Sequence, residues 1–118
     1  MKRMVNQELL KTIRLLKKSA SKEAAPIWRD VAERLSKPRS RRIIVNLSRI
    51  NRYSVDGETV LVPGKVLGSG KLDHPVKVAA FSFSKTARAK ILEAGGEVMT
   101  IQDLINRNPK GLKVKLMG

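Results

Sequence analysis

The spacing of apolar residues changes near residue 42, and this change constrains the fold more than any other feature of the sequence. Up to residue 38, apolar side chains recur at helical intervals in two stretches, which predicts one helix over residues 7–19 and a second that begins at Pro26 and ends before Pro38. Beyond residue 42, short β-branched runs alternate with short helical segments and with turns that contain Gly or Pro. The sequence therefore predicts an α/β fold, with a helical N-terminal third followed by an irregular arrangement of short strands and short helices.

The expected strands are rich in β-branched residues or alternate apolar with polar residues. Pro63 and Gly64 are expected to end one strand and to separate it from the next. In the C-terminal tail, apolar residues alternate with lysines, and this segment is expected to add an edge strand to the sheet. The expected strands cover residues 43–45, 59–62, 65–67, 76–83, 97–99 and 112–116.

Three short helices are expected between these strands. One covers residues 46–52, and a second follows Ser84, a typical capping residue. The third begins at Thr100, which is spaced to form a capping box with Asp103, and extends to about residue 106. The helical residues expected to face the core are Ile27, Trp28, Val31, Ala32 and Leu35 in the second N-terminal helix and Ala87, Ile91 and Leu92 after Ser84.

Length and charge indicate a small domain that binds a polyanion. The 118 residues fit a single domain over residues 1–118, in which a helical pair (1–38) precedes an α/β core (39–118) with basic and Gly-rich loops. The chain holds 25 Lys and Arg residues against 10 Asp and Glu residues, which gives a formal net charge of +15. Because such a charge destabilises an isolated compact domain by self-repulsion, we expect a polyanionic partner.

The sequence also argues against secretion and membrane insertion. It contains no Cys, which excludes disulfides, zinc–thiolate sites and a cysteine nucleophile. Basic residues interrupt every apolar run before it reaches the length of a signal peptide or a membrane span. We therefore expect a cytoplasmic protein that binds no membrane.

The positive charge is concentrated in the first half of the chain. Residues 1–52 hold fifteen Lys or Arg residues and four acidic residues, whereas residues 53–118 hold ten and six. From Arg34 to Arg52 there are seven basic residues, six of them Arg, and no acidic residue. A guanidinium group can bind phosphate in a bidentate manner and stack on bases, so this stretch favours nucleic acid over a membrane surface. A basic loop that is merely solvated is the alternative.

Aromatic residues are scarce. Trp28, Phe81 and Phe83 are assigned to the core. Tyr53, beside Arg52, is then either an exposed stacking platform or a half-buried ring with a solvated hydroxyl group. Proteins that bind single strands usually carry several aromatic platforms, so we expect recognition to depend on phosphates and on the shape of RNA or DNA.

The Gly-rich segment at residues 64–72 only superficially resembles a nucleotide-binding loop. Ser69 stands where a Walker loop needs Gly, and Leu72 stands where it needs Ser or Thr. A flexible backbone flanked by Lys65 and Lys71 is nevertheless a candidate for close contact with nucleic-acid phosphates.

No other group of residues indicates catalysis. His74 is the only histidine, and its side chain and that of Asp73 are expected to point apart on an extended chain. A loop hydrogen bond or an RNA contact remains as its role. We expect no enzyme activity, cofactor, metal ion or small-molecule substrate.

Long ordered motifs run through the chain. The main motifs are Lys37-Pro38-Arg39 with Arg42, the segments 45–53 and 62–70, and Leu72-Asp73-His74. Residues 28–32 and 94–96 are two further motifs of the same kind. Together these motifs resemble the eighteen-e family of archaeal and eukaryotic large-subunit ribosomal proteins over nearly the whole chain, with a length similar to that of the compact archaeal form. Ile43 departs from the small residue expected at its position.

The resemblance implies a fold related to the C-terminal part of bacterial large-subunit protein fifteen. It further implies a non-catalytic protein that holds folded large-subunit rRNA in the cytoplasmic ribosome, beside neighbouring ribosomal proteins. By matching positions, the basic connector 37–42, the segment 46–52 and the loop 64–74 are expected to face rRNA. The candidate RNA-binding residues are Lys37, Arg39, Arg41, Arg42, Asn46, Arg49, Asn51, Arg52, Lys65, Lys71 and His74.

Two other classes of protein compete with this interpretation. A free-standing nucleic-acid-binding protein, of the chromatin or regulatory type, would use the same arginines, and charge alone does not separate it from a ribosomal protein. An RNA-modifying enzyme would need a substrate pocket with an acid, a base or a cofactor site, which the sequence does not indicate.

Overall fold

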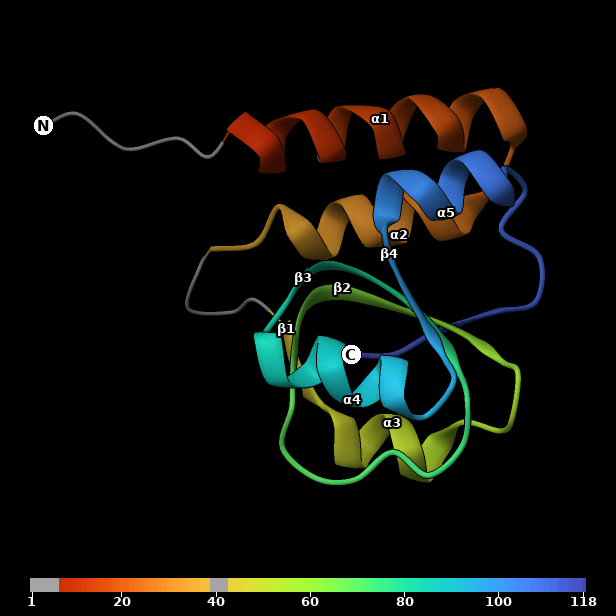
Figure 1. Cartoon of the computed structure of the whole chain (residues 1–118). Helices are drawn as coiled ribbons and strands as arrows, with labels where there is room; N and C mark the ends of the chain where they lie inside the picture. Colours follow the sequence, from red (N-terminus) through yellow and green to blue (C-terminus); the bar gives the residue numbers. More distant parts are fainter. Residues whose placement is uncertain (1–6, 39–42) are drawn as a thin grey trace, which may run out of the picture.

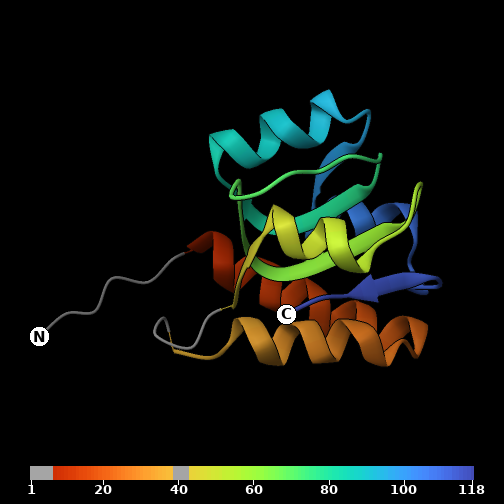
Figure 2. The ribbon, with the colours of Figure 1, turned by 90° about the horizontal axis from the view of Figure 1, so that it is seen from below.

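The computed structural model describes residues 7–38 and 43–118 as three layers, with a sheet between two groups of helices (Figure 1). Two N-terminal helices, α1 (Gln7–Glu23) and α2 (Pro26–Leu35), lie with α5 (Ile101–Arg107) on one face of the sheet. On the opposite face are α3 (Leu47–Tyr53) and α4 (Lys85–Glu93) (Figure 2). This arrangement confirms the predicted α/β class with its helical N-terminal third.

In the described residues the sheet has five strands, and all of their pairings are parallel. Across the sheet the order is β1 (Ile43–Asn46), β2 (Thr59–Leu67), β3 (Lys77–Phe83) and β4 (Glu97–Thr100). The C-terminal strand β5 (Val114–Leu116) pairs with the first half of β2, whereas β1 pairs with its second half. The two short strands therefore share one edge of β2. The predicted C-terminal edge strand is confirmed at residues 114–116, whereas residues 112 and 113 form a turn.

β2 is one continuous strand, and the prediction that Pro63 and Gly64 separate two strands was wrong. The pairing with β3 changes register between Val62 and Lys65, and this irregularity accommodates Pro63, which has no amide to donate. Gly64 is buried against β1, where a side chain would collide with the carbonyl group of Ile43. The two residues mark a bulge and a close approach within one strand.

Two hydrophobic cores, one on each face of the sheet, follow from the alternation of side chains along the strands. Leu61 belongs to the core under α1, α2 and α5, whereas Val60 and Val62 belong to the core under α3 and α4. Trp28 is fully buried in the first core, and its indole Nε1 donates a 2.6 Å hydrogen bond to the carbonyl oxygen of Pro109. Its assignment as a packing residue is confirmed.

The helix ends follow local signals that the sequence contains. α1 extends about one turn beyond the predicted residue 19, to Glu23, and ends where Ala24 adopts a left-handed conformation at φ 51°. At the start of α5, the Thr100 hydroxyl accepts from the amide of Asp103 at 3.0 Å, and the Asp103 carboxylate accepts from the amide of Thr100 at 3.2 Å. The predicted capping box is therefore confirmed.

α4 differs from the prediction at one residue. The Ser84 hydroxyl caps the helix by accepting from the amide of Ala87 at 3.1 Å, and Ala87 and Ile91 are fully buried. Leu92, which we expected to face the core, is 52% exposed. One step along a helix rotates the side chain by about 100°, so the residue after Ile91 turns away from the sheet.

Candidate nucleic-acid interface

α3 presents a basic surface because its apolar residues anchor it to the core beneath. Leu47 and Ile50 are fully buried, and the spacing of three residues puts both on the inner side of the helix. Arg49, Arg52 and Tyr53 are exposed on its outer side. Asn46 stands at the N-cap position, where its side chain makes no capping hydrogen bond.

Arg49 and Arg52 have no hydrogen-bond or ion-pair partner among residues 7–38 and 43–118. Other arginines of the protein are engaged. Arg34 pairs with Asp30 at 2.9 Å and donates to the carbonyl oxygen of Gly118, and Arg107 lies 2.6 Å from a carboxylate. The two guanidinium groups of α3 are therefore available to an external anion.

The Gly-rich loop after β2 is held in place between α3 and α4. The Lys90 ammonium group donates to the carbonyl oxygens of Gly68 and Gly70, both at 2.8 Å, and the amide of Ser48 donates to the carbonyl oxygen of Ser69 at 3.1 Å. Close packing also requires both glycines: added side chains would meet Thr86 on α4 and Ser48 on α3 at 2.5–2.6 Å. The backbone that the sequence suggested to be flexible is instead pinned at three carbonyl groups.

The same loop ends in a hydrogen-bonded cluster at His74. The ring lies 2.9 Å from the hydroxyl of Ser54 through Nε2 and 3.1 Å from the carboxylate of Asp73 through Nδ1. The amide of Asp73 in turn donates to the side-chain oxygen of Asn51 at 3.1 Å. The prediction that the Asp73 and His74 side chains point apart was wrong, because the chain bends at His74 instead of running extended.

The cluster gives two of the candidate RNA-binding residues a structural role. His74, with a side chain 17% exposed, and Asn51 on α3 together tie the loop to the helix. Side-chain hydrogen bonds to the Asp73 carboxylate, that from His74 first and that from Asn51 second, hold the pKa of this carboxyl group below its usual value. The predicted loop hydrogen bond of His74 is confirmed, and an RNA contact by either residue stays a prediction.

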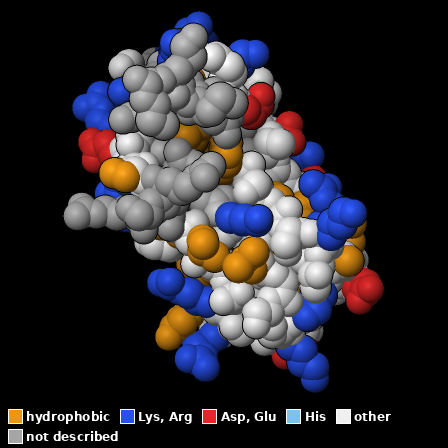
Figure 3. Space-filling view, turned by 90° about the vertical axis from the view of Figure 1, so that its left-hand side faces the viewer, with side chains coloured by type: hydrophobic (Ala, Val, Ile, Leu, Met, Phe, Trp, Pro, Cys, Tyr) orange, Lys and Arg blue, Asp and Glu red, His pale blue; other side chains and the backbone are white. Residues whose placement is uncertain are grey.

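The remaining candidates occupy separate elements. Lys65 is exposed on β2 opposite Ile44 of β1, Lys71 is exposed in the Gly-rich loop, and Lys37 is exposed just after α2. Arg39, Arg41 and Arg42 lie outside the described residues. On the side of the molecule shown in Figure 3, Lys and Arg side chains spread over the surface and are more prominent than acidic side chains.

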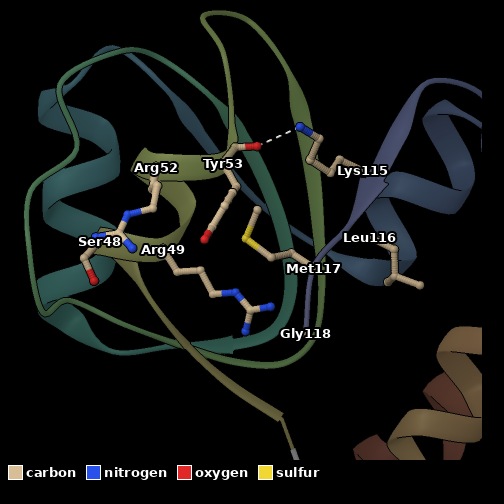
Figure 4. A pocket seen from close by; sticks show the side chains of 8 residues that line it. All are labelled: Ser48, Arg49, Arg52, Tyr53, Lys115, Leu116, Met117 and Gly118. Atoms are coloured by element: carbon tan, nitrogen blue, oxygen red, sulfur yellow. Dashed lines mark hydrogen bonds between the residues drawn. The ribbon is translucent and has the colours of Figure 1, made fainter.

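A hollow of about 740 Å³ beside α3 is the feature that sequence reasoning missed (Figure 4). Its other wall is the C-terminal segment that continues β5. Lys115 links the two walls, because its ammonium group donates to the carbonyl oxygen of Tyr53 at 2.7 Å. The alternation around residue 115 signalled a strand, but the sequence contained no signal that this strand lies next to α3. The lining residues are Ser48, Arg49, Arg52, Tyr53, Lys115, Leu116, Met117 and Gly118.

Tyr53 is exposed in the structure, and its use as a stacking platform stays a prediction. Tyr53 is 55% exposed, whereas Trp28 is fully buried. Phe81 and Phe83 are partly buried and pack against the first and the second core, respectively. All four aromatic residues lie in the described part of the chain, and Tyr53 is the one that presents its ring to solvent.

Neither a membrane-spanning helix nor a metal site is found in residues 7–38 and 43–118. Within these ranges no helix is long and apolar enough to cross a membrane. The described residues also contain no group of three His, Asp or Glu side chains placed to hold a metal ion.

Comparison with known proteins identifies the family. Residues 2–118 match the model of the family described as ribosomal protein 60S L18 and 50S L18e. A large ribosomal subunit protein eL18 from Methanothermobacter thermautotrophicus is 54% identical over 112 residues, which cover 95% of this chain and 93% of that protein. Proteins of the same name from Methanococcus maripaludis and Archaeoglobus fulgidus are 49% and 51% identical, over 96% and 98% of this chain and 94% and 98% of theirs. The chain therefore belongs to the eL18 family of large-subunit ribosomal proteins.

Proposed function

We propose that this protein is a structural constituent of the large ribosomal subunit that binds and stabilises folded large-subunit rRNA through a basic surface. That surface comprises the outer side of α3, Lys65 on β2, the Gly-rich loop with Lys71, and the connector that contains Lys37, Arg39, Arg41 and Arg42. It needs no cofactor, because its task is to hold RNA and not to transform a substrate. Neighbouring large-subunit proteins are further proposed partners.

The observation that carries the proposal is the pair of exposed arginines on α3. Neither Arg49 nor Arg52 is neutralised within the described residues, although the helix that bears them is firmly anchored by Leu47 and Ile50. A guanidinium group on a rigid element loses little conformational freedom when it binds phosphate. With a net charge of +15, the chain also gains stability from a polyanion that relieves its self-repulsion.

Sedimentation of large subunits through a gradient tests the ribosomal role. We expect the protein to travel with large subunits in equimolar amount, as a structural constituent does. A protein that stays at the top of the gradient, or that occurs in far fewer copies than ribosomes, would instead support the free-standing nucleic-acid-binding alternative.

A double substitution tests the proposed surface on the purified protein. Arg49→Gln with Arg52→Gln should lower affinity for large-subunit rRNA and reduce the slope of log affinity against log salt by about one unit per lost phosphate contact. Arg14→Gln with Arg29→Gln is the matched control, because these exposed arginines lie on α1 and α2 and the change in charge is the same. Equal losses in the two variants would mean that only global charge matters.

A further inference from the structure

The hollow beside α3 combines features that phosphate binding alone does not require. Its lining contains Arg49, Arg52 and Lys115 and no acidic residue. It also contains the exposed ring of Tyr53 and the thioether of Met117, a residue that is 5% exposed. In Figure 4 the side chains of Tyr53, Arg49 and Met117 point toward the same space, whereas Leu116 points away from it.

The backbone that carries the Tyr53 ring is fixed from two sides. Lys115 donates to the carbonyl oxygen of Tyr53 at 2.7 Å and lies 3.3 Å from the carboxylate of Glu58. The next residue, Ser54, is buried, and its hydroxyl lies 2.9 Å from the ring of His74. An exposed aromatic ring on a fixed backbone is a prepared stacking surface, since little conformational entropy is lost when a flat ligand covers it.

The opposite wall is equally well anchored. The amide of Met117 donates to the carbonyl oxygen of Leu61 at 2.9 Å, which extends the C-terminal segment along β2 beyond β5. The carbonyl oxygen of Gly118 accepts from Arg34 at 2.6 Å. The hollow, of about 740 Å³, thus has hydrogen-bonded backbone on both sides and lies in the size range of roughly 300–1,000 Å³ that is usual for ligand sites.

The charges around the hollow select an anionic ligand with a flat apolar part. Glu58 already compensates Lys115, so the uncompensated charge in this part of the described chain is that of Arg49 and Arg52. Unpaired nucleotides match this combination, because proteins recognise them by stacking the base on aromatic rings or guanidinium planes while cations bind the phosphates. An acidic peptide would use the two arginines but not the exposed ring.

We propose that this hollow receives one unpaired rRNA nucleotide, with its base stacked on Tyr53 beside Met117 and its phosphates bound by Arg49 and Arg52. The inference rests on the proposed rRNA-binding function and adds a base contact to it. In the sequence, the scarcity of aromatic residues favoured recognition by phosphates and shape; the structure assigns the single exposed ring to a place where a base fits.

The test measures affinity for large-subunit rRNA of Methanothermobacter thermautotrophicus, transcribed in vitro, over a range of salt concentrations. Tyr53→Leu should bind about 5- to 150-fold more weakly, as expected for one lost base stack, with an unchanged salt slope because no phosphate contact is lost. Tyr53→Phe keeps the ring and should bind within about twofold of the wild type. Val55→Ala removes a neighbouring side chain that is 67% exposed and does not line the hollow, and it should have no effect.

The possible outcomes separate this inference from the function on which it rests. Tyr53→Leu binding within twofold of the wild type, or a loss that Val55→Ala reproduces, would overturn the nucleotide site and leave the proposed function standing. A variant that binds rRNA normally but enters large subunits poorly would also overturn it, and would identify a protein partner at the hollow. Failure of the wild-type protein itself to bind the rRNA would instead overturn the proposed function.

Discussion

At the scale of single residues, basic side chains of this protein serve two different purposes. Arg34, Lys90 and Lys115 donate to backbone carbonyl groups and so hold the fold together. Arg49 and Arg52 do so nowhere in the described residues. The sequence cannot separate the two groups, because the carbonyl groups that Lys90 and Lys115 reach lie 20 to 62 positions away along the chain.

Trp28 provides a prediction about stability. Trp28→Ala should lower the free energy of unfolding by about 3–5 kcal/mol, because it removes a fully buried ring and leaves a cavity between α1, α2 and the sheet. Urea unfolding followed by circular dichroism measures the loss. Tyr53→Leu, a change on the surface, should cost no more than about 0.5 kcal/mol. A cost below about 1 kcal/mol for Trp28→Ala would contradict its role as a core residue.

Asp73 provides a prediction about pH. Its carboxyl group should titrate below its ordinary pKa of 3.8 in the folded protein, because hydrogen bonds from His74 and Asn51 favour the ionised form. The stabilisation that this carboxylate supplies is complete above the unfolded pKa and is lost as the pH falls through the lower folded pKa. Titration of the carboxyl carbon by NMR measures the value. His74→Phe should move the pKa upward, toward 3.8, and an unchanged value in this variant would show that His74 is not the main cause.

At the scale of elements, the proposed surface depends on how two short helices hold a loop. α3 contributes an amide and α4 contributes Lys90, and together they bind three consecutive carbonyl groups at residues 68–70. The glycines at positions 68 and 70 allow both helices to approach. The loop that the sequence indicated as a phosphate contact is therefore positioned by the helices on either side of it.

Lys90→Met tests this arrangement. Loss of two hydrogen bonds from a charged donor should cost about 1–3 kcal/mol and should speed amide hydrogen exchange in residues 68–71. Affinity for rRNA should fall as well, because the loop is no longer held in its binding position. Lys85→Met is the matched control: Lys85 is an exposed lysine on the same helix that makes none of these contacts. Exchange that rises equally in both variants would indicate a general effect of lost charge.

At the scale of the whole molecule, one sheet joins two hydrophobic cores. Each strand of the central pair, β2 and β3, contributes alternate side chains to the core above and to the core below. Neither core can lose its strands without exposing the other. We therefore propose that residues 1–118 form a single cooperative domain, although the N-terminal helices pack on one face only.

Equilibrium unfolding in urea tests this proposal with one probe in each core. The fluorescence of Trp28 reports the first core, and the methyl resonance of Ile91 reports the second. A single cooperative transition predicts the same midpoint for both signals. Two separate midpoints would show that the helical N-terminal third unfolds as an independent unit.

The sequence by itself determined the features that depend on near neighbours. Helical spacing identified α1 and α2, the capping residues Ser84 and Thr100 marked the starts of α4 and α5, and the β-branched runs located the strands. Ordered motifs indicated the ribosomal family, which the comparisons show, whereas the nucleic-acid partner predicted from the acid-free run of arginines stays a prediction. These signals lie in continuous stretches of the chain or in the order of its motifs, so no knowledge of the tertiary contacts is needed to read them.

Only the tertiary structure decided which distant residues meet. β2 continues through Pro63 and Gly64 because β3 accommodates a change of register and β1 packs closely, and neither strand adjoins that site in sequence. His74 meets Ser54, and the C-terminal segment lies against α3, across separations of 20 and about 60 residues. The proposed nucleotide site exists because β5 pairs with the edge of β2 that β1 leaves open, a choice made by the packing of the whole sheet.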